Sequence, residues 1–232
     1  MGSSTTPATV HQLHLGHVVL PASHPRSDEV TCEIYGYVIE HPDGLIVVDT
    51  GPRSGHAVID ELYAPQVASI VDALNSAGLE EREVMAVVNT HLHFDHCGQN
   101  NAFANAPIWV TAAEYEASLA EFYTVPDWAE ITESQRRISQ DGESITDGVR
   151  LLHTPGHTPG HQSVAVDTAN GLELIVGQAC YSCAEYEAAA PAEVDMHDAT
   201  WVEAGLDSLN RLRALHPRLA HFSHDAATHR RR

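Results

Sequence analysis

Short apolar runs alternate with polar, turn-rich segments along most of this 232-residue chain. Several runs have the length and the β-branched content of buried strands. They lie at residues 45–49, 84–88, 149–152, 162–166 and 172–177. Shorter runs predict further strands at residues 12–20, 35–40, 108–110 and 219–220. Asp43-Gly44 is a turn signal that predicts a hairpin between residues 35–40 and 45–49.

Apolar residues at helical spacing predict three helices between these strands, over residues 67–77, 112–122 and 201–215. Gly78 is a stop signal for the first helix. The third is amphipathic, with Pro217 ending it and one apolar stripe formed by Val202, Leu206, Leu209 and Leu212. The alternation of strands and helices predicts the α/β class.

A chain of 25.2 kDa with 43% hydrophobic residues fits one globular domain, residues 1–232. Residues 1–30 are a polar N-terminal segment that contains the first strand. Residues 121–147 lack a strong strand signal and carry Phe122, Tyr123, Val125, Trp128 and Ile131. This segment is interpreted either as a lid or wall over a binding site, or as ordinary packing of a surface helix.

The formal charge of −20 arises from 32 acidic residues against 12 arginines, with no lysine. This balance repels phosphate backbones and argues against nucleic-acid partners. It favours a small-molecule substrate that is neutral or weakly charged, and it disfavours glutathione thioesters, whose carboxylates need cationic partners.

The four cysteines do not form a disulfide framework pattern, and Cys180-x-x-Cys183 has no second pair to complete a thiolate metal site. An alternative that stays open is that one of these two cysteines faces the active site. The chain shows no secretory leader pattern and no apolar stretch of about 20 residues that would cross a bilayer. A cytoplasmic protein without membrane contact is therefore expected.

Metal-ligand chemistry is concentrated in His91-Leu92-His93-Phe94-Asp95-His96, directly after the predicted strand 84–88. Imidazole and carboxylate suit zinc and other first-row divalent ions. Because so short a segment cannot aim all four groups at one ion, it predicts two adjacent positions, His91 with His93 and Asp95 with His96. The alternative is a histidine-rich loop in a chain with 17 histidines.

Two further clusters follow other predicted strands. The first is the segment 154–161, in which two Pro-Gly turns flank His157 and hold its backbone. The second is His221-Phe222-Ser223-His224-Asp225. Candidate ligands at the ends of different strands are typical of a metal site on one edge of a sheet scaffold. His161 and His221 are interpreted as supporting or packing residues rather than ligands.

The sequence resembles the metallo-β-lactamase-fold hydrolases and, among them, the N-acyl-homoserine lactone lactonases. The resemblance spans about residues 30–228 and is carried by Val48 to Gly51, Thr90 to Gly98, Glu114 to Glu116, Thr154 to Ser163, Tyr181, and Ser223 to Asp225. It implies a four-layer αβ/βα sandwich with the metals at one edge between two sheets. It also implies one metal position formed by His91, His93 and His157, and a second formed by Asp95, His96 and His224.

One position departs from the family pattern. Where the family places an aspartate that bridges both metals, after the predicted strand 172–177, this chain has Gln178. Glutamine is neutral and offers one carbonyl oxygen. Four outcomes stay open: weaker or mononuclear metal binding, coordination of one ion with a hydroxide between the metals, a harmless replacement, or loss of activity.

The resemblance implies a metal-dependent hydrolase that opens a lactone or related ester by attack of metal-bound hydroxide on the carbonyl. Tyr181 would hydrogen-bond the carbonyl oxygen, and Asp95 would pass a proton to the leaving alkoxide. The expected cofactor is zinc, as one or two ions, with iron or manganese as alternatives. Other functions stay open: a thioesterase or polyketide-processing hydrolase, a non-hydrolytic metal enzyme, or a ligand-binding protein without turnover. The native substrate and the oligomeric state, a homodimer included, are also open.

Overall fold

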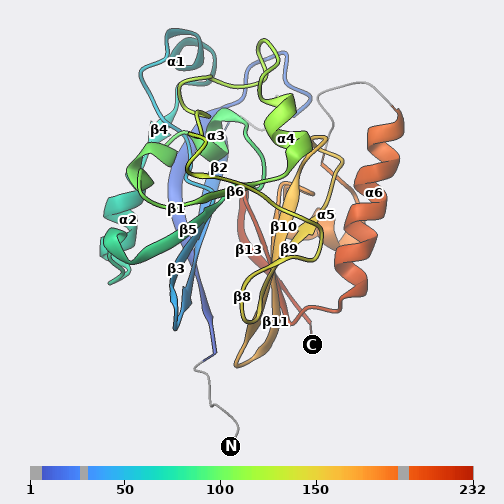
Figure 1. The fold of residues 1–232 in the computed structure, drawn as a ribbon. Coiled ribbons are helices and arrows are strands. Elements are labelled where there is room, and N and C mark those ends of the chain that lie inside the picture. Colours follow the sequence, from blue (N-terminus) through green and yellow to red (C-terminus); the bar gives the residue numbers. More distant parts are fainter. Residues whose placement is uncertain (1–6, 27–30, 193–198, 232) are drawn as a thin grey trace, which may run out of the picture.

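The computed structural model describes residues 7–26, 31–192 and 199–231. Parts of the predicted N-terminal segment, at 1–6 and 27–30, lie outside the described residues. Two β-sheets face each other, and helices cover the outer face of each sheet (Figure 1). This arrangement is the predicted four-layer αβ/βα sandwich, so the predicted fold class is confirmed.

The first sheet contains seven strands. In spatial order these are β4 (Gln66–Val67), β1 (Thr9–Val19), β2 (Thr31–His41), β3 (Gly44–Val48), β5 (Val84–Val88), β6 (Ile108–Val110) and β7 (Arg136–Ile138). Strands β1, β2 and β3 pair antiparallel, whereas β3, β5, β6 and β7 pair parallel. The carboxyl ends of the parallel strands therefore meet at one edge of the sheet.

The second sheet contains six strands. In spatial order these are β13 (Asp225–Arg230), β12 (Leu219–Phe222), β11 (Gly171–Gly177), β10 (Gln162–Thr168), β9 (Val149–His153) and β8 (Ser144–Thr146). All of its pairings are antiparallel except that of β11 with β12.

Six α-helices accompany the sheets in the described residues. They are α1 (Ala57–Tyr63), α2 (Ile70–Ser76), α3 (Phe94–Cys97), α4 (Ala112–Ala117), α5 (Cys183–Ala188) and α6 (Ala199–Ala214). Two short 3-10 turns lie at Glu81–Glu83 and Asn100–Phe103. In Figure 1, α2 lies on the outer side of the first sheet, and α6 lies on the outer side of the second.

Three apolar clusters fill the spaces between the four layers. The central cluster joins the two sheets and includes Ile39, Val48, Val88, Leu151 and Val164. A second packs α2 against the first sheet, and a third packs α6 against the second sheet. The hydroxyl of Tyr37 on β2 donates a hydrogen bond to the carbonyl oxygen of Phe222 on β12, at 2.6 Å, and so links the sheets through a buried polar contact.

Two predicted helices are shorter than expected. The predicted helix 67–77 begins only at Ile70, because the side chain of Ser69 caps its amino end and Val67 pairs with Gly16 as part of β4. The predicted helix 112–122 ends at Ala117. It gives way to a series of turns that leads to the exposed Phe122.

The buried stripe of α6 differs from the predicted one. Leu209 and Leu212 are fully buried as expected, but Val202 and Leu206 are 54% and 41% exposed. The backbone of α6 instead approaches the turn at Gly156 so closely through Gly205 that a Cβ on Gly156 would lie 2.4 Å from the Gly205 Cα. The buried face of α6 therefore includes Gly205 as well as Leu209 and Leu212.

Residues 121–147 contain two short strands, β7 and β8, that the sequence pattern did not predict. Trp128 and Ile131 are buried packing residues. Phe122, Tyr123 and Val125 line a cavity described below. The segment thus contains both packing residues and cavity-lining residues, and its role as a lid stays a prediction.

All four cysteines are free. None of the helices in the described residues combines the length and apolar character that a membrane crossing requires.

Candidate metal centre

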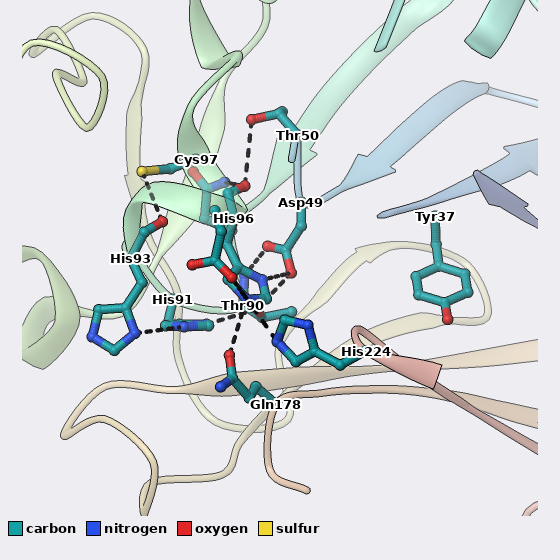
Figure 2. Close-up of polar contacts among 12 residues, drawn as sticks. Tyr37, Asp49, Thr50, Thr90, His91, His93, His96, Cys97, Gln178 and His224 are labelled. Carbon is teal, nitrogen blue, oxygen red and sulfur yellow. Dashed lines mark hydrogen bonds and ion pairs between the residues drawn. The ribbon is translucent and has the colours of Figure 1, made fainter. Parts of the chain in front are cut away.

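The loops after four strands bring the predicted ligands to one edge of the sandwich. His91 and His93 follow β5, His157 follows β9, Gln178 follows β11, and His224 follows β12. Figure 2 shows His91, His93, His96, Gln178 and His224 gathered around one point, although they come from both sheets. The edge at which the sheets meet therefore assembles residues that are up to 133 positions apart in sequence (His91 to His224, 224 − 91).

The first group is formed by His91, His93 and His157, whose ligand atoms lie within 4.8 Å of one another. The Nε2 of His91 lies 3.1 Å from the Nδ1 of His93, and the Nε2 of His157 lies 3.2 Å from the same atom. Three imidazole nitrogens thus converge on a small volume from two different loops.

The second group is formed by Asp95, His96 and His224. The Oδ2 of Asp95 lies 3.4 Å from the Nε2 of His96 and 4.0 Å from the Nε2 of His224. The Nδ1 of His224 donates to the carbonyl oxygen of Glu33, at 2.9 Å, so its Nε2 is left to face Asp95. That Nε2 is buried and has no hydrogen-bond partner among the described residues.

A single buried carboxylate, Asp49, supports residues of both groups. It accepts hydrogen bonds from the backbone N–H of Thr90 at 2.7 Å, from the Thr90 hydroxyl at 2.7 Å, and from the Nδ1 of His96 at 2.9 Å. Because the Thr90 hydroxyl donates to Asp49, its oxygen can accept from the Nδ1 of His91, 3.2 Å away. Asp49 thereby orients the Nε2 atoms of His91 and His96 toward the centre.

A second buried carboxylate, Glu114, holds the loops of the first group. It accepts from the backbone N–H of Leu92 at 2.8 Å and from the hydroxyl of Thr158 at 2.7 Å, and it also accepts from the hydroxyl of Tyr123. Leu92 lies between His91 and His93 in sequence, and Thr158 follows His157, so one side chain fixes both loops.

The protonation of the groups follows from burial and neighbouring charge. Burial, together with the neighbouring imidazole of His96, lowers the pKa of His91 well below its usual range, so this ring is neutral. Burial and His96 likewise lower the pKa of His224 to about 4. Burial alone would lower the pKa of His96, but the Asp95 and Asp49 carboxylates outweigh it and raise that pKa to about 10.

The donor set fits a divalent cation. Both nitrogens of His96 face acceptors, since its Nδ1 meets Asp49 while its Nε2 lies 3.0 Å from the Oε1 of Gln178 and 3.4 Å from Asp95. Without a metal, His96 must carry a proton on both nitrogens to bond these acceptors. A cation bound at the Nε2 would take the place of one of those protons. Neutral imidazoles and an ionised carboxylate are the ligand forms that zinc takes.

Gln178 is 4% exposed and directs its side-chain oxygen toward His96 of the second group. Its backbone N–H donates to the Nε2 of His161 at 3.0 Å, and the Nδ1 of His161 contacts the Thr154 hydroxyl at 2.8 Å. His161 is thus occupied by protein partners on both nitrogens. His221 pairs with Glu173 at 2.9 Å, away from the two groups.

Tyr181 lies beside the second group, with its ring centroid 5.0 Å from that of His224. The guanidinium of Arg26 stacks on the Tyr181 ring, 4.2 Å from its centroid. Arg26 also donates to the Oε1 of Glu185 at 2.6 Å, and the Oε2 of Glu185 accepts from the Tyr181 backbone N–H at 2.7 Å. Arg26 and Glu185 therefore hold Tyr181 by its ring and by its backbone.

A cavity of about 320 Å³ opens in front of the centre. Six of its lining residues belong to the candidate centre or its surroundings: His93, Asp95, His157, Gln178, Tyr181 and His224. Its other lining residues are largely apolar, among them Val18, Leu20, Val58, Ile59, Leu62, Tyr63, Phe94, Phe122 and Val125. Among the described residues, no arginine lines this cavity. It suits a small molecule with an apolar portion.

Some residues of the site were not assigned a role from the sequence. The family motifs contain Asp49 and Glu114, but only the structure shows that they orient both loops. Nothing in the local sequence marks Arg26. Cys32 lines the cavity, and its Sγ lies 3.2 Å from the Nδ1 of His224. Cys180 is instead fully buried against the α6 layer.

The comparisons with known proteins identify the family. The model of the metallo-beta-lactamase superfamily matches residues 31–224. The chain therefore belongs to this superfamily, and it is a metal-dependent hydrolase.

Several curated relatives and solved structures similar to this chain are lactonases. The chain is 34% identical over 209 residues to an N-acyl homoserine lactonase of a Bacillus species, and 32% identical over 209 residues to one of Bacillus cereus. Each alignment covers 83% of this chain and 81% of the relative. A structure of an N-acyl homoserine lactone hydrolase with the product N-hexanoyl-L-homoserine at its catalytic metal centre has a TM-score of 0.80 at 29% identity, and covers 95% of this chain and 94% of that chain.

Proposed function

We propose that this enzyme opens the ring of N-acyl homoserine lactones or related lactones with an uncharged acyl group. The observation that carries the proposal is that members of both ligand groups line a largely apolar cavity together with Tyr181. The lactonase relatives support the choice of a lactone.

The two groups would each hold one divalent ion, with zinc as the expected metal. His91, His93 and His157 would hold the first, and Asp95, His96 and His224 the second. Ions bound there supply a water of lowered pKa and a Lewis acid for a carbonyl oxygen.

The residues of the chain position the substrate and move protons. The Tyr181 hydroxyl donates a hydrogen bond to the ester carbonyl oxygen and strengthens that bond as negative charge develops, an effect typically worth about 3 kcal/mol. Although burial alone would raise it, the pKa of Asp95 is held far below its usual range by His96 and His224. Asp95 is therefore ionised before the reaction, which leaves its carboxylate able to carry a proton to the leaving alkoxide, although the lowered pKa makes it a weak base.

Gln178 changes the charge of the centre rather than its shape. Its oxygen lies beside the Nε2 of His96, but it brings no negative charge to offset two cations. We expect Gln178→Asp to retain metal more tightly against a chelator than the wild type does, because a carboxylate supplies that charge.

The test is a lactonase assay on zinc-loaded protein with N-hexanoyl and N-decanoyl homoserine lactones, following ring opening by proton release. Hydrolysis that disappears on chelation and returns with zinc is expected. Intact lactones in metal-replete protein would overturn the proposal. Turnover of acyl thioesters alone would assign the site to a thioesterase, and tight lactone binding without turnover would indicate a sensor.

A further inference from the structure

A second cluster of potential metal ligands lies outside the cavity, where α5 meets β13. Cys183 and Glu187 are four residues apart on α5 and so share one face of the helix. His229 on β13 faces them, and one ligand atom from each of the three residues lies within 4.8 Å of the others.

The distances within this cluster are close to those of a coordinated ion. The Nδ1 of His229 lies 3.0 Å from the Oε1 of Glu187, and the Sγ of Cys183 lies 3.9 Å from the same oxygen. Tetrahedral zinc, with its usual bond lengths, separates such ligand atoms by about 3.3 to 3.6 Å. The ring of Tyr186 packs on that of His229, with centroids 5.2 Å apart, and helps to fix the imidazole.

The charge around the thiol also favours a cation. The backbone N–H of Cys183 donates to the Oδ2 of Asp225 at 3.0 Å, so this carboxylate lies beside the cluster together with that of Glu187. Burial and these two carboxylates raise the pKa of the Cys183 thiol. A bound divalent ion opposes all three effects, because it stabilises the thiolate and offsets the carboxylates.

We propose that Cys183, Glu187 and His229 bind one divalent ion of the zinc class, with water completing the coordination. The Cys183 thiol releases its proton to solvent when the ion binds. The ion would clamp α5 to β13. Helix α5 begins two residues after Tyr181 and β13 begins one residue after His224. The clamp therefore holds the backbone next to both side chains, and it does not depend on which substrate the enzyme hydrolyses.

The chain offers a matched control. The Nε2 of His11 lies 2.9 Å from the Oε2 of Glu40, which is a similar exposed imidazole–carboxylate pair with no thiol beside it. His11→Gln removes that pair, whereas His229→Gln removes an imidazole from the proposed site.

The first test is the metal content and the cobalt spectrum of the full-length protein. Wild type and His11→Gln are expected to bind one more ion per chain than Cys183→Ser or His229→Gln. Their cobalt forms are expected to show a thiolate-to-cobalt charge-transfer band that both site variants lack. Equal metal content in all four proteins would overturn the proposal. The proposal would also fail if Cys32→Ser lost the band and Cys183→Ser kept it, since the cobalt-bound thiolate would then be that of Cys32, beside His224.

A second test uses only the wild type, so it does not depend on the folding of a variant. Alkylation of Cys183 by iodoacetamide is followed by peptide mass spectrometry with and without zinc. With zinc about a hundredfold above its Kd, the free site falls to about 1% and alkylation should slow about a hundredfold. An unchanged alkylation rate would contradict the clamp while leaving the lactonase proposal untouched.

Discussion

Replacing Asp49 tests whether one carboxylate orients ligands of both groups. It is 2% exposed and accepts three hydrogen bonds, two from Thr90 and one from the Nδ1 of His96. In Asp49→Asn one oxygen becomes an NH2 donor, which favours the His96 tautomer that carries its proton on Nε2. That tautomer cannot bind a metal through Nε2. Asp49 has φ = 58°, a conformation that asparagine also tolerates, so backbone strain is not the cause of the effect.

The expected magnitude follows from the loss of one orienting partner. Removing such a partner weakens metal affinity about 10- to 100-fold, or about 1.4 to 2.7 kcal/mol. The assay is zinc affinity by competition with a chelator, together with lactonase activity at saturating zinc. We expect weaker zinc binding, with activity recovered in part when zinc is added in excess.

The matched control is Glu173→Gln, which removes another buried carboxylate bound to an imidazole. Glu173 accepts from the Nε2 of His221 at 2.9 Å, and neither residue belongs to the ligand groups. This variant should lose stability without losing zinc affinity. The reasoning is refuted if Asp49→Asn binds zinc as tightly as the wild type, or if Glu173→Gln weakens binding by as much.

Variants at three further residues test other parts of the site and the fold. Tyr181→Phe should lower kcat about 150-fold, the equivalent of about 3 kcal/mol, with unchanged metal content; an unchanged kcat would remove Tyr181 from the reaction. Arg26→Met removes the stacking on Tyr181 and the contact with Glu185, so kcat should fall about tenfold with no metal lost. Arg26→Lys should restore part of the lost kcat. If Arg26→Met has the kcat of the wild type, Arg26 does not position Tyr181. Burial raises the pKa of the Tyr37 hydroxyl above its usual range, so its contribution to stability is complete below about pH 10 and is lost as pH rises further. Urea unfolding should show a smaller alkaline loss of stability in Tyr37→Phe than in the wild type, because other buried tyrosines and cysteines with raised pKa values contribute in both. At neutral pH the variant should be less stable, because the Phe222 carbonyl loses its donor.

The positions of the candidate ligands were predictable because each follows a strand with a clear apolar pattern. His91, His157 and His224 sit directly after β5, β9 and β12, and strand ends meet at one edge of a sheet. The fold followed from the family resemblance, since the alternation of elements alone indicates only the α/β class.

The parts that the sequence did not predict depend on contacts between distant residues. Arg26 reaches Tyr181 across 155 positions (181 − 26), and no local pattern signals such a contact. Val202 and Leu206 match the leucine stripe of α6, but the close approach of Gly205 to Gly156 sets which face is buried. Strand β7 is a three-residue segment at the edge of the first sheet that pairs with β6 alone, so its sequence carries almost no strand pattern.

The most direct test of the central claim is elemental analysis of protein purified without added metal and then loaded with zinc. It is made in the Cys183→Ser background so that the count reports the cavity centre alone. We predict about two ions per chain, one held by each group, falling to about one in either His157→Ala or His224→Ala. No bound ion in the parent protein, or a count that neither histidine variant changes, would contradict the assignment of both groups as metal sites.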